Sequence, residues 1–276
     1  MPSFIEKRAP AQLQIVDYER IRQRDPAELV KLLQACRPPA NGGRGVFYLD
    51  LRGPTAHQTL INLNATYDGT LQYFQQPHNK KMEDLCQSDE RGYKPGESFE
   101  TLEINHDEYV FGTRKLPAVL KPFEADMGGL ISSCDTIVRD LMSVLLVDPS
   151  SRGENPANKP NDTGLKICLQ AAHFAPWEVT GHAHTDMGVL SLLFYNAATM
   201  ELPALPSTDA SAENWELIEP VDGCVVVNVA DTLQRMSGGE FHSPVHRVVQ
   251  PDNVPETGTP IIIYYLRDTG SGARVV

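Results

Sequence analysis

The stretch SPVHRVVQPDNVPETGTPIIIYYLR, residues 243–267, contains two short β-rich runs separated by a segment of turn composition. Four similar runs precede it, at residues 165–174, 188–196, 215–220 and 223–230. The runs are regularly spaced and no helical period lies between them, which is typical of an antiparallel sandwich or barrel. We therefore expect residues 165–276 to form an all-β core.

The N-terminal part of the chain has a different pattern. Residues 25–36 (DPAELVKLLQAC) repeat apolar side chains at helical spacing behind an Asp-Pro start, which predicts a capped helix. A strand at 46–51, a second helix at about 57–75 and a loop at 89–98 are predicted to follow. We expect residues 1–121 to form a region of helices and strands that packs against the β core.

A long helix and a loop are predicted between these two regions. Apolar residues recur every three or four positions from Pro122 to Val147, over about six turns. The segment from Asp148 to Gly164 is polar and rich in Pro, Gly and Asn, as exposed loops are. We therefore interpret residues 122–164 as a core-backing helix and the loop that leads into the β region.

Composition excludes several classes of protein. The 276 residues include 24 Lys and Arg against 36 Asp and Glu, a formal net charge of −12 that repels phosphate backbones and anionic lipid. The longest apolar runs are too short to cross a bilayer, and the N-terminus lacks the pattern of a secretory signal. The five cysteines are widely spaced and never form CxxC, which favours a reducing compartment. We expect a cytoplasmic protein that binds neither nucleic acid nor membrane.

Two short motifs in the β region carry candidate metal ligands. His184 and Asp186 in GHAHTDMG are two residues apart at the end of an extended segment, so their side chains leave the same face. His246 lies in another β run about 60 residues later. Two imidazoles and one carboxylate from two strands can occupy one face of an Fe(II) octahedron and leave positions open for substrate and dioxygen. Each motif alone is more often structural than metal-binding.

Longer patterns surround both motifs. Residues 227–249 read VNVADTLQRMSGGEFHSPVHRVV, and residues 184–194 read HTDMGVLSLLF. Upstream lie, in order, IVD near Ile15, FYLDL, YFQQPHNKKME and RGYKPG. Over nearly the whole chain, from about residue 12 to about residue 268, these segments resemble the isopenicillin N synthase-like group of the Fe(II)/2-oxoglutarate-dependent dioxygenase superfamily.

This resemblance implies a mainly β fold with flanking helices, in which a double-stranded β-helix (a distorted jelly roll) follows a helical N-terminal region. Iron would be held at its open end by His184, Asp186 and His246, with 2-oxoglutarate and dioxygen as cosubstrates. Decarboxylation of the 2-oxo acid would drive hydroxylation, desaturation or ring formation on a small-molecule metabolite. His182 lies two residues before His184 and could replace it, although the family's motif favours His184.

The chain departs from the group's cosubstrate motif. Relatives grip the distal carboxylate of 2-oxoglutarate with an Arg-x-Ser pair about ten residues past the second histidine, through charge-assisted hydrogen bonds. The corresponding residues here are Gly258 and Pro260, or Thr259 and Ile261 if the alignment shifts by one. Neither choice supplies arginine or serine.

The nearest cations do not fill this position. Arg267 lies at the far end of the same predicted strand, and Arg247 is expected to face away from the iron because strand side chains alternate. Where relatives commonly have Asn and Tyr near the cosubstrate, this chain has Cys168 and Gln170.

Three functions therefore stay open. The first is a 2-oxoglutarate-dependent oxygenase whose cosubstrate carboxylate is held by other groups, such as Thr259, Tyr264 and a basic residue from a loop, with Cys168 and Gln170 as further cosubstrate contacts. The second is an iron oxidase of the isopenicillin N synthase type, which needs no 2-oxo acid, and the third is a catalytically inactive metal-binding jelly roll. One of the neighbouring Tyr264 and Tyr265 should face the pocket. Leu193 and Tyr264 are the predicted substrate contacts, within an apolar wall formed by Leu190, Leu192, Leu193 and Phe194. A homodimer would be one way to cover the pocket mouth.

Overall fold

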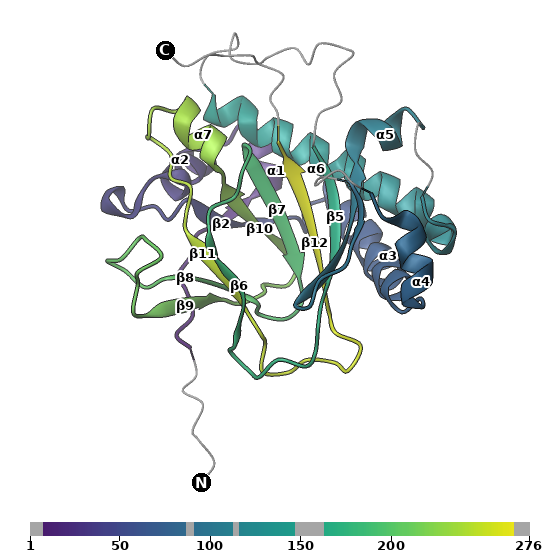
Figure 1. Cartoon of the computed structure of the whole chain (residues 1–276). Coiled ribbons are helices and arrows are strands. Elements are labelled where there is room, and N and C mark those ends of the chain that lie inside the picture. Colours follow the sequence, from purple (N-terminus) through teal and green to yellow (C-terminus); the bar gives the residue numbers. More distant parts are fainter. Residues whose placement is uncertain (1–7, 87–90, 113–115, 147–162, 268–276) are drawn as a thin grey trace.

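The computed structural model describes residues 8–86, 91–112, 116–146 and 163–267, and these fold around two facing β-sheets (Figure 1). The strands of the larger sheet are β1 (Ile15–Asp17), β2 (Val46–Asp50), β3 (Gly92–Lys94), β4 (Phe99–Asn105), β5 (Gly164–Gln170), β7 (Leu190–Tyr195), β10 (Cys224–Val229) and β12 (Thr259–Leu266). Those of the smaller sheet are β6 (Val179–His184), β8 (Met200–Pro203), β9 (Trp215–Ile218) and β11 (His246–Val249).

The two sheets have a jelly-roll-like strand order. The larger sheet runs β1-β2-β10-β7-β12-β5-β4-β3, and the smaller runs β6-β11-β8-β9. Neighbouring strands pair antiparallel, except β1 and β2, which are parallel. Strands β1 to β4 come from the N-terminal region and extend the larger sheet at both edges, so this region completes the same sheet as the C-terminal strands.

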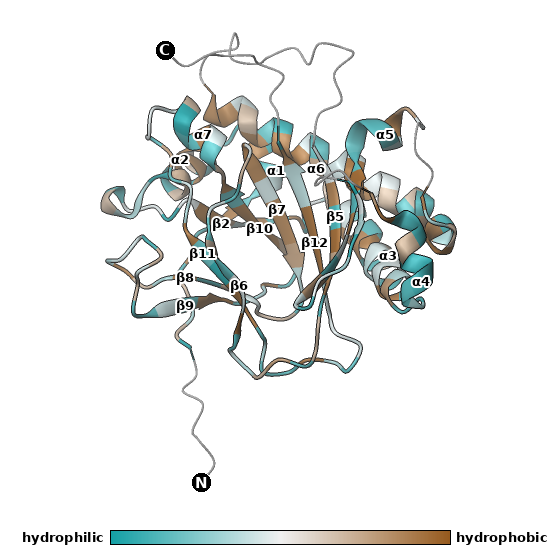
Figure 2. Ribbon diagram, viewed as in Figure 1, coloured by the Kyte–Doolittle hydropathy of each residue, from teal (hydrophilic) through white to brown (hydrophobic). Residues whose placement is uncertain are grey.

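The helices are α1 (Tyr18–Arg22), α2 (Pro26–Cys36), α3 (His57–Phe74), α4 (His78–Lys81), α5 (His106–Val110), α6 (Glu124–Leu145) and α7 (Asp231–Met236), with short 3-10 turns η1 (Pro39–Asn41), η2 (Met82–Asp84) and η3 (Ala118–Phe123). Of these, α2, α3 and α6 cover the outer face of the larger sheet. Helices α3 and α6 pack on each other and on β12, and α2 packs on β1 and β2. Figure 2 shows the strands β10, β7 and β12 as mainly hydrophobic, which fits their burial between two layers.

The apolar face of α6 packs the helices against the larger sheet. Leu130, Ile137 and Leu141 are fully or almost fully buried in the core between the helices and the larger sheet. Each such side chain stabilises the fold by roughly 1.5–3 kcal/mol relative to an exposed one. A second, smaller core lies between the two sheets and includes Leu193 and Ile261.

Most predicted elements of the first half are confirmed. The helix at 25–36 is α2, and the Asp25 carboxylate caps it by accepting hydrogen bonds from the backbone N–H groups of Ala27 and Glu28. The predicted strand at 46–51 is β2 and the helix at 57–75 is α3. The long helix at 122–147 is α6, which begins two residues later because Pro122 lies in the preceding 3-10 turn. Of the predicted loop at 148–164, only its end lies within the described residues.

Several strands differ from the sequence prediction. The predicted loop at 89–98 contains β3, and β4 and the four-residue β8 did not stand out as β-rich runs. The sequence of β4, FETLEIN, carries glutamates that form ion pairs, Glu100 with Lys81 and Glu103 with Lys166. Cross-strand and tertiary partners thus stabilise a strand of low intrinsic β-propensity. Among the described residues, none of the helices is long and apolar enough to cross a membrane.

Candidate metal centre

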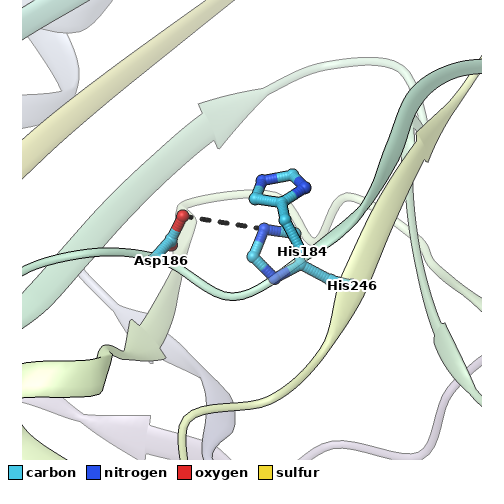
Figure 3. A group of neighbouring side chains, drawn as sticks. All are labelled: His184, Asp186 and His246. Atoms are coloured by element: carbon cyan, nitrogen blue, oxygen red, sulfur yellow. Dashed lines mark ion pairs between the residues drawn. The ribbon is translucent and has the colours of Figure 1, made fainter. Parts of the chain in front are cut away.

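Three predicted metal ligands meet at one end of the space between the sheets. His184 is the last residue of β6 and His246 is the first of β11, and the two are directly paired in the antiparallel register. Asp186 lies in the loop after β6. One ligand atom from each residue lies within 4.8 Å of the other two, and His246 Nε2 is 3.7 Å from Asp186 Oδ1. Figure 3 shows the two imidazoles and the carboxylate turned toward one another.

Backbone carbonyls set the orientation of both imidazoles. His184 Nδ1 is 2.7 Å from the carbonyl oxygen of His182, and His246 Nδ1 is 3.2 Å from that of Pro244. Because a carbonyl oxygen only accepts hydrogen bonds, each Nδ1 carries a proton, so Nε2 is the nitrogen of each ring that can offer its lone pair to a metal. Burial lowers the pKa of His246, further lowered by His184, although Asp186 opposes this. The ring is therefore neutral, as metal binding requires.

Two side chains hold one oxygen of Asp186. The Ser191 hydroxyl and the Asn228 amide Nδ2 both donate to Asp186 Oδ2, the latter over 3.1 Å. Burial alone would raise the pKa of Asp186, but His246 and these two hydrogen bonds bring it below its ordinary value. The carboxylate is therefore ionised, and Oδ1 is the oxygen directed toward His246.

The loop that carries Asp186 is tied down at its backbone. The carbonyl of Asp186 accepts from the N–H of Asp231 and that of Gly188 from the N–H of Thr232, both at the start of α7. Gly188 has φ +100, and a Cβ there would lie 2.8 Å from the carbonyl oxygen of Leu266. Only glycine fits this turn without strain. In the sequence HTDMG, the backbone conformation therefore requires Gly188, while His184 and Asp186 are the candidate metal ligands.

This donor set fits Fe(II). Two imidazoles and one carboxylate that converge from one side match the facial triad of non-haem iron oxygenases and leave coordination positions for other ligands. The ring of His182 is exposed and does not belong to this group of three, and its backbone carbonyl is the part that contacts His184. Of the two alternatives that the sequence left open, the geometry favours His184.

A cavity of about 280 Å³ adjoins the three ligands. It lies between the two sheets, with walls from β4, β5, β7, β10 and β12 on one side and from β6, β8 and β11 on the other. Besides the ligands it is lined by Phe99, Thr101, Lys166, Cys168, Gly181, Ser191, Leu193, Thr199, Met200, Asn228, Val248, Ile261, Ile263 and Tyr265.

Only one of the three predicted cosubstrate contacts lies at the cavity. Cys168 lines the cavity, but Gln170 and Thr259 do not. Gln170 is fully buried at the end of β5, where its Nε2 donates to Thr180 Oγ1 and to the Val249 carbonyl, both at 3.0 Å. It therefore joins the larger sheet to the smaller one, and Thr259 is its partner in the β5–β12 register. The expectation that Gln170 and Thr259 contact the cosubstrate is not supported.

Only one of the two predicted substrate contacts lies at the cavity. Leu193 lines the cavity, but the prediction for Tyr264 is wrong. Tyr264 faces the helix layer, and its hydroxyl donates to Asp135 Oδ1 of α6 over 3.2 Å. Tyr265 is the tyrosine that lines the cavity, because successive residues of β12 point to opposite faces. Alternation also places Leu190, Leu192 and Phe194 in the core with the helices, away from the cavity.

The cations near the site lie as follows. Arg247 faces away from the cavity, as expected, and its Nε donates to the buried carboxylate of Glu201 over 2.7 Å. Arg267 follows β12 and stacks on the ring of Tyr265 with its guanidinium carbon 4.8 Å from the ring centroid. Lys166 lines the cavity directly.

Sequence reasoning missed several residues of the site, among them Lys166, Ser191 and Asn228, whereas it named Tyr265 as the alternative to Tyr264. A signal for Lys166 was present, because it lies two residues before Cys168 on the same predicted strand and must share its face. Ser191 and Asn228 had no such signal, since their importance comes from the pairing of β7 with β10, which places them side by side.

Comparisons with known proteins identify the family. Residues 166–267 match the model of the 2OG-Fe(II) oxygenase superfamily. The chain is 30% identical, over 92% of its length and 81% of the relative's, to the 2-oxoglutarate-dependent dioxygenase frbH of Dothideomycetidae sp.. It is 28% identical to the 2-oxoglutarate-dependent dioxygenase FG08081 of Gibberella zeae, over 95% of this chain and 81% of that one. The chain belongs to the 2OG-Fe(II) oxygenase superfamily, which is named for oxygenases that use Fe(II) and 2-oxoglutarate.

Solved structures share the fold. A full-length protein of Neurospora crassa, crystallised in complex with alpha-KG, matches with a TM-score of 0.72 at 21% identity and covers 95% of this chain and 88% of its own. The dioxygenase for auxin oxidation 1 of Arabidopsis thaliana, in a 2-oxoglutarate complex, matches with a TM-score of 0.71 at 18% identity, covering 92% of each chain. The jelly-roll-like core predicted from the sequence is thereby confirmed.

Proposed function

We propose that this protein is a non-haem Fe(II)- and 2-oxoglutarate-dependent oxygenase that oxidises a small-molecule metabolite, with iron held by His184, Asp186 and His246. The observation that carries the proposal is the convergence of these three side chains at the wall of a cavity of about 280 Å³. Its sequence motifs favour the isopenicillin N synthase-like group within the superfamily. The related fungal dioxygenases support a role on secondary metabolites.

The residues of the chain have separate tasks in such a reaction. The bound iron supplies dioxygen activation coupled to decarboxylation of the 2-oxo acid. His184 and His246 would hold the iron through Nε2 and Asp186 through Oδ1, while Ser191 and Asn228 keep Oδ2 hydrogen-bonded. Leu193, Ile261 and Ile263 give the cavity apolar walls that exclude water from the reacting groups.

Anaerobic titration tests this function. The purified protein is loaded with Fe(II), and 2-oxoglutarate is added while the weak metal-to-ligand charge-transfer band is followed in the visible spectrum. We expect a band in the wild type, and succinate release when oxygen and a suitable substrate are supplied. Iron binding without the band would favour the 2-oxoglutarate-independent oxidase instead, and absence of iron binding would contradict both enzymes.

Variants of the histidines test the ligand assignment. We expect His184→Ala and His246→Ala to abolish stoichiometric iron binding, because two protein ligands do not retain the metal. His182→Ala is the matched control, since it removes a neighbouring imidazole whose ring lies outside the group of three. Equal iron loss in His182→Ala and His184→Ala would contradict the assignment.

A further inference from the structure

One cation faces the cavity beside the metal centre. Among the described residues that line the cavity, Lys166 is the only lysine or arginine. It belongs to β5, it lines the cavity, and its side chain is 26% exposed. No other positive side chain in this lining can neutralise an anion that enters.

The position of Lys166 relative to the metal ligands follows from the strand register. Ile263 of β12 is paired with both Lys166 and Leu193, whereas Tyr265 is paired with Ser191, which contacts Asp186. Lys166 therefore lies one inward-facing residue, about 7 Å along the strands, beyond the level of Ser191, and two strands away from it across the sheet, roughly 10 Å at the usual strand spacing. The long lysine side chain covers part of this distance, and a dicarboxylate bound at the metal by its 2-oxo acid end would extend its distal carboxylate toward the ammonium group.

The ion pair of Lys166 leaves the ammonium available. Its Nζ is 3.2 Å from Glu103 Oε1, on the neighbouring strand β4, and Glu103 does not line the cavity. Burial lowers the pKa of Lys166, but Cys168 and Glu103 more than offset this and raise it above its ordinary value. A charged ammonium has three N–H donors, so it can bind Glu103 and a second carboxylate together.

We propose that Lys166 binds the distal carboxylate of 2-oxoglutarate in the cavity. This inference rests on the proposed function and names the residue that fixes the far end of its cosubstrate. A dianion in a cavity of low polarity needs a charged donor, and an ammonium–carboxylate hydrogen bond is stronger than a neutral one.

The test compares two 2-oxo acids that differ only at the distal end. In 2-oxopentanoate a methyl group replaces the distal carboxylate of 2-oxoglutarate. Anaerobic titrations of the Fe(II)-loaded protein give a dissociation constant for each acid from the charge-transfer band. We expect Lys166→Met to weaken 2-oxoglutarate by about 10- to 100-fold and to leave 2-oxopentanoate within about threefold. Lys166→Arg should retain most of the preference for 2-oxoglutarate.

Control variants separate binding from folding. Lys121→Met removes an exposed lysine that is paired with Glu124, and it should change neither constant. If Lys166→Met folds poorly because Glu103 is left unpaired, the double variant Lys166→Met/Glu103→Gln removes both charges and gives the same comparison.

Each outcome decides. If Lys166→Met leaves both dissociation constants unchanged, or weakens both acids equally, Lys166 does not bind the distal carboxylate, and this inference is overturned while the proposed function stands. If the wild type gives no band with either acid, the proposed function fails and this inference fails with it. A selective loss of 2-oxoglutarate affinity supports the assignment.

Discussion

The two hydrogen bonds on Asp186 Oδ2 are the smallest feature on which the metal site depends. Ser191 and Asn228 keep this oxygen occupied and so present Oδ1 to the metal. Partners that orient a ligand typically contribute 10- to 100-fold to metal affinity. We expect Ser191→Ala and Asn228→Ala each to weaken Fe(II) binding by about tenfold or more, measured by anaerobic competition with a chelator of known affinity.

Thr199→Val is the control for these variants. It removes another hydroxyl from the cavity lining, and the described contacts include no hydrogen bond from this side chain to Asp186. We expect its Fe(II) affinity to equal that of the wild type. Equal weakening by Thr199→Val and Ser191→Ala would mean that cavity polarity, rather than the orientation of Asp186, sets the affinity.

At the scale of single residues, the sequence predicts the candidate metal ligands better than it predicts which side chains line the cavity. His184, Asp186 and His246 could be found because their residue types and the two-residue spacing restrict the chemistry. The choice between Tyr264 and Tyr265 could not be predicted. Because side chains alternate along a strand, the two tyrosines must face opposite sides of the sheet, but the sequence does not say which side faces the cavity. The pairing of β12 with β5 and β7 determines which of the two tyrosines faces the cavity.

Among the elements, the loop from β6 to β7 has the strictest backbone requirement. A Cβ at Gly188 would meet the carbonyl oxygen of Leu266 at 2.8 Å in a backbone conformation of positive φ. We expect Gly188→Ala to destabilise the protein by about 1–3 kcal/mol, and to weaken Fe(II) binding because Asp186 is two residues away. Urea unfolding and chelator competition measure the two effects.

Gly238→Ala is the matched control for the loop. Gly238 also has positive φ (+63), but no atom lies within 4 Å of the position of its Cβ. We expect a loss of about 1 kcal/mol from the backbone conformation alone, with unchanged Fe(II) affinity. A Gly188→Ala variant that behaves like Gly238→Ala would show that the close approach to Leu266 is not important.

The contact between α6 and β12 gives a second prediction for the elements. Tyr264 donates to Asp135 from a fully buried position, so Tyr264→Phe should lower the free energy of unfolding by about 1 kcal/mol. It should leave the affinity for 2-oxoglutarate unchanged, because Tyr264 faces away from the cavity. Thermal or urea unfolding and the charge-transfer titration measure both quantities, and a loss of affinity without a loss of stability would contradict this placement.

The elements themselves were predicted unevenly. Helices α2, α3 and α6 could be predicted because each has a long apolar period, and Asp25 with Pro26 marks the start of α2. Strands β3, β4 and β8 could not, because they are short or carry charges whose partners lie elsewhere in the chain, such as Lys166 for Glu103. Tertiary pairing, which leaves no local signal, determines such strands.

On the scale of the whole molecule, the burial of the cysteines predicts which thiols are protected from alkylation. All five lie in the described part of the chain and none forms a disulfide. Cys36 and Cys134 are fully buried, and burial raises the pKa of both thiols and raises that of Cys168 to about 12. Since the thiolate is the reactive form, the native protein should resist alkylation at these three positions.

Intact-mass measurement after iodoacetamide treatment at mildly alkaline pH tests this pattern. We expect modification to begin at the partly exposed Cys86 and to be slower at Cys224, because burial raises the pKa of Cys224 to about 11. All five thiols should react after unfolding in urea. Rapid alkylation of Cys168 in the native protein would contradict its burial in the cavity. Protection of the core thiols against alkylation would then report directly on the integrity of the packed interior.

The place of β6 in the smaller sheet has a consequence for dynamics. In the described strand order β6 is an edge strand, hydrogen-bonded to β11 alone, and most of its residues are at least partly exposed. Edge strands open locally at low free-energy cost, yet this one ends in His184. A metal bound across His184, Asp186 and His246 would fasten the edge to its neighbour, so amide hydrogen exchange in residues 179–188 should slow when Fe(II) is added without oxygen. Iron loading and the closing of this edge would then be one coupled equilibrium.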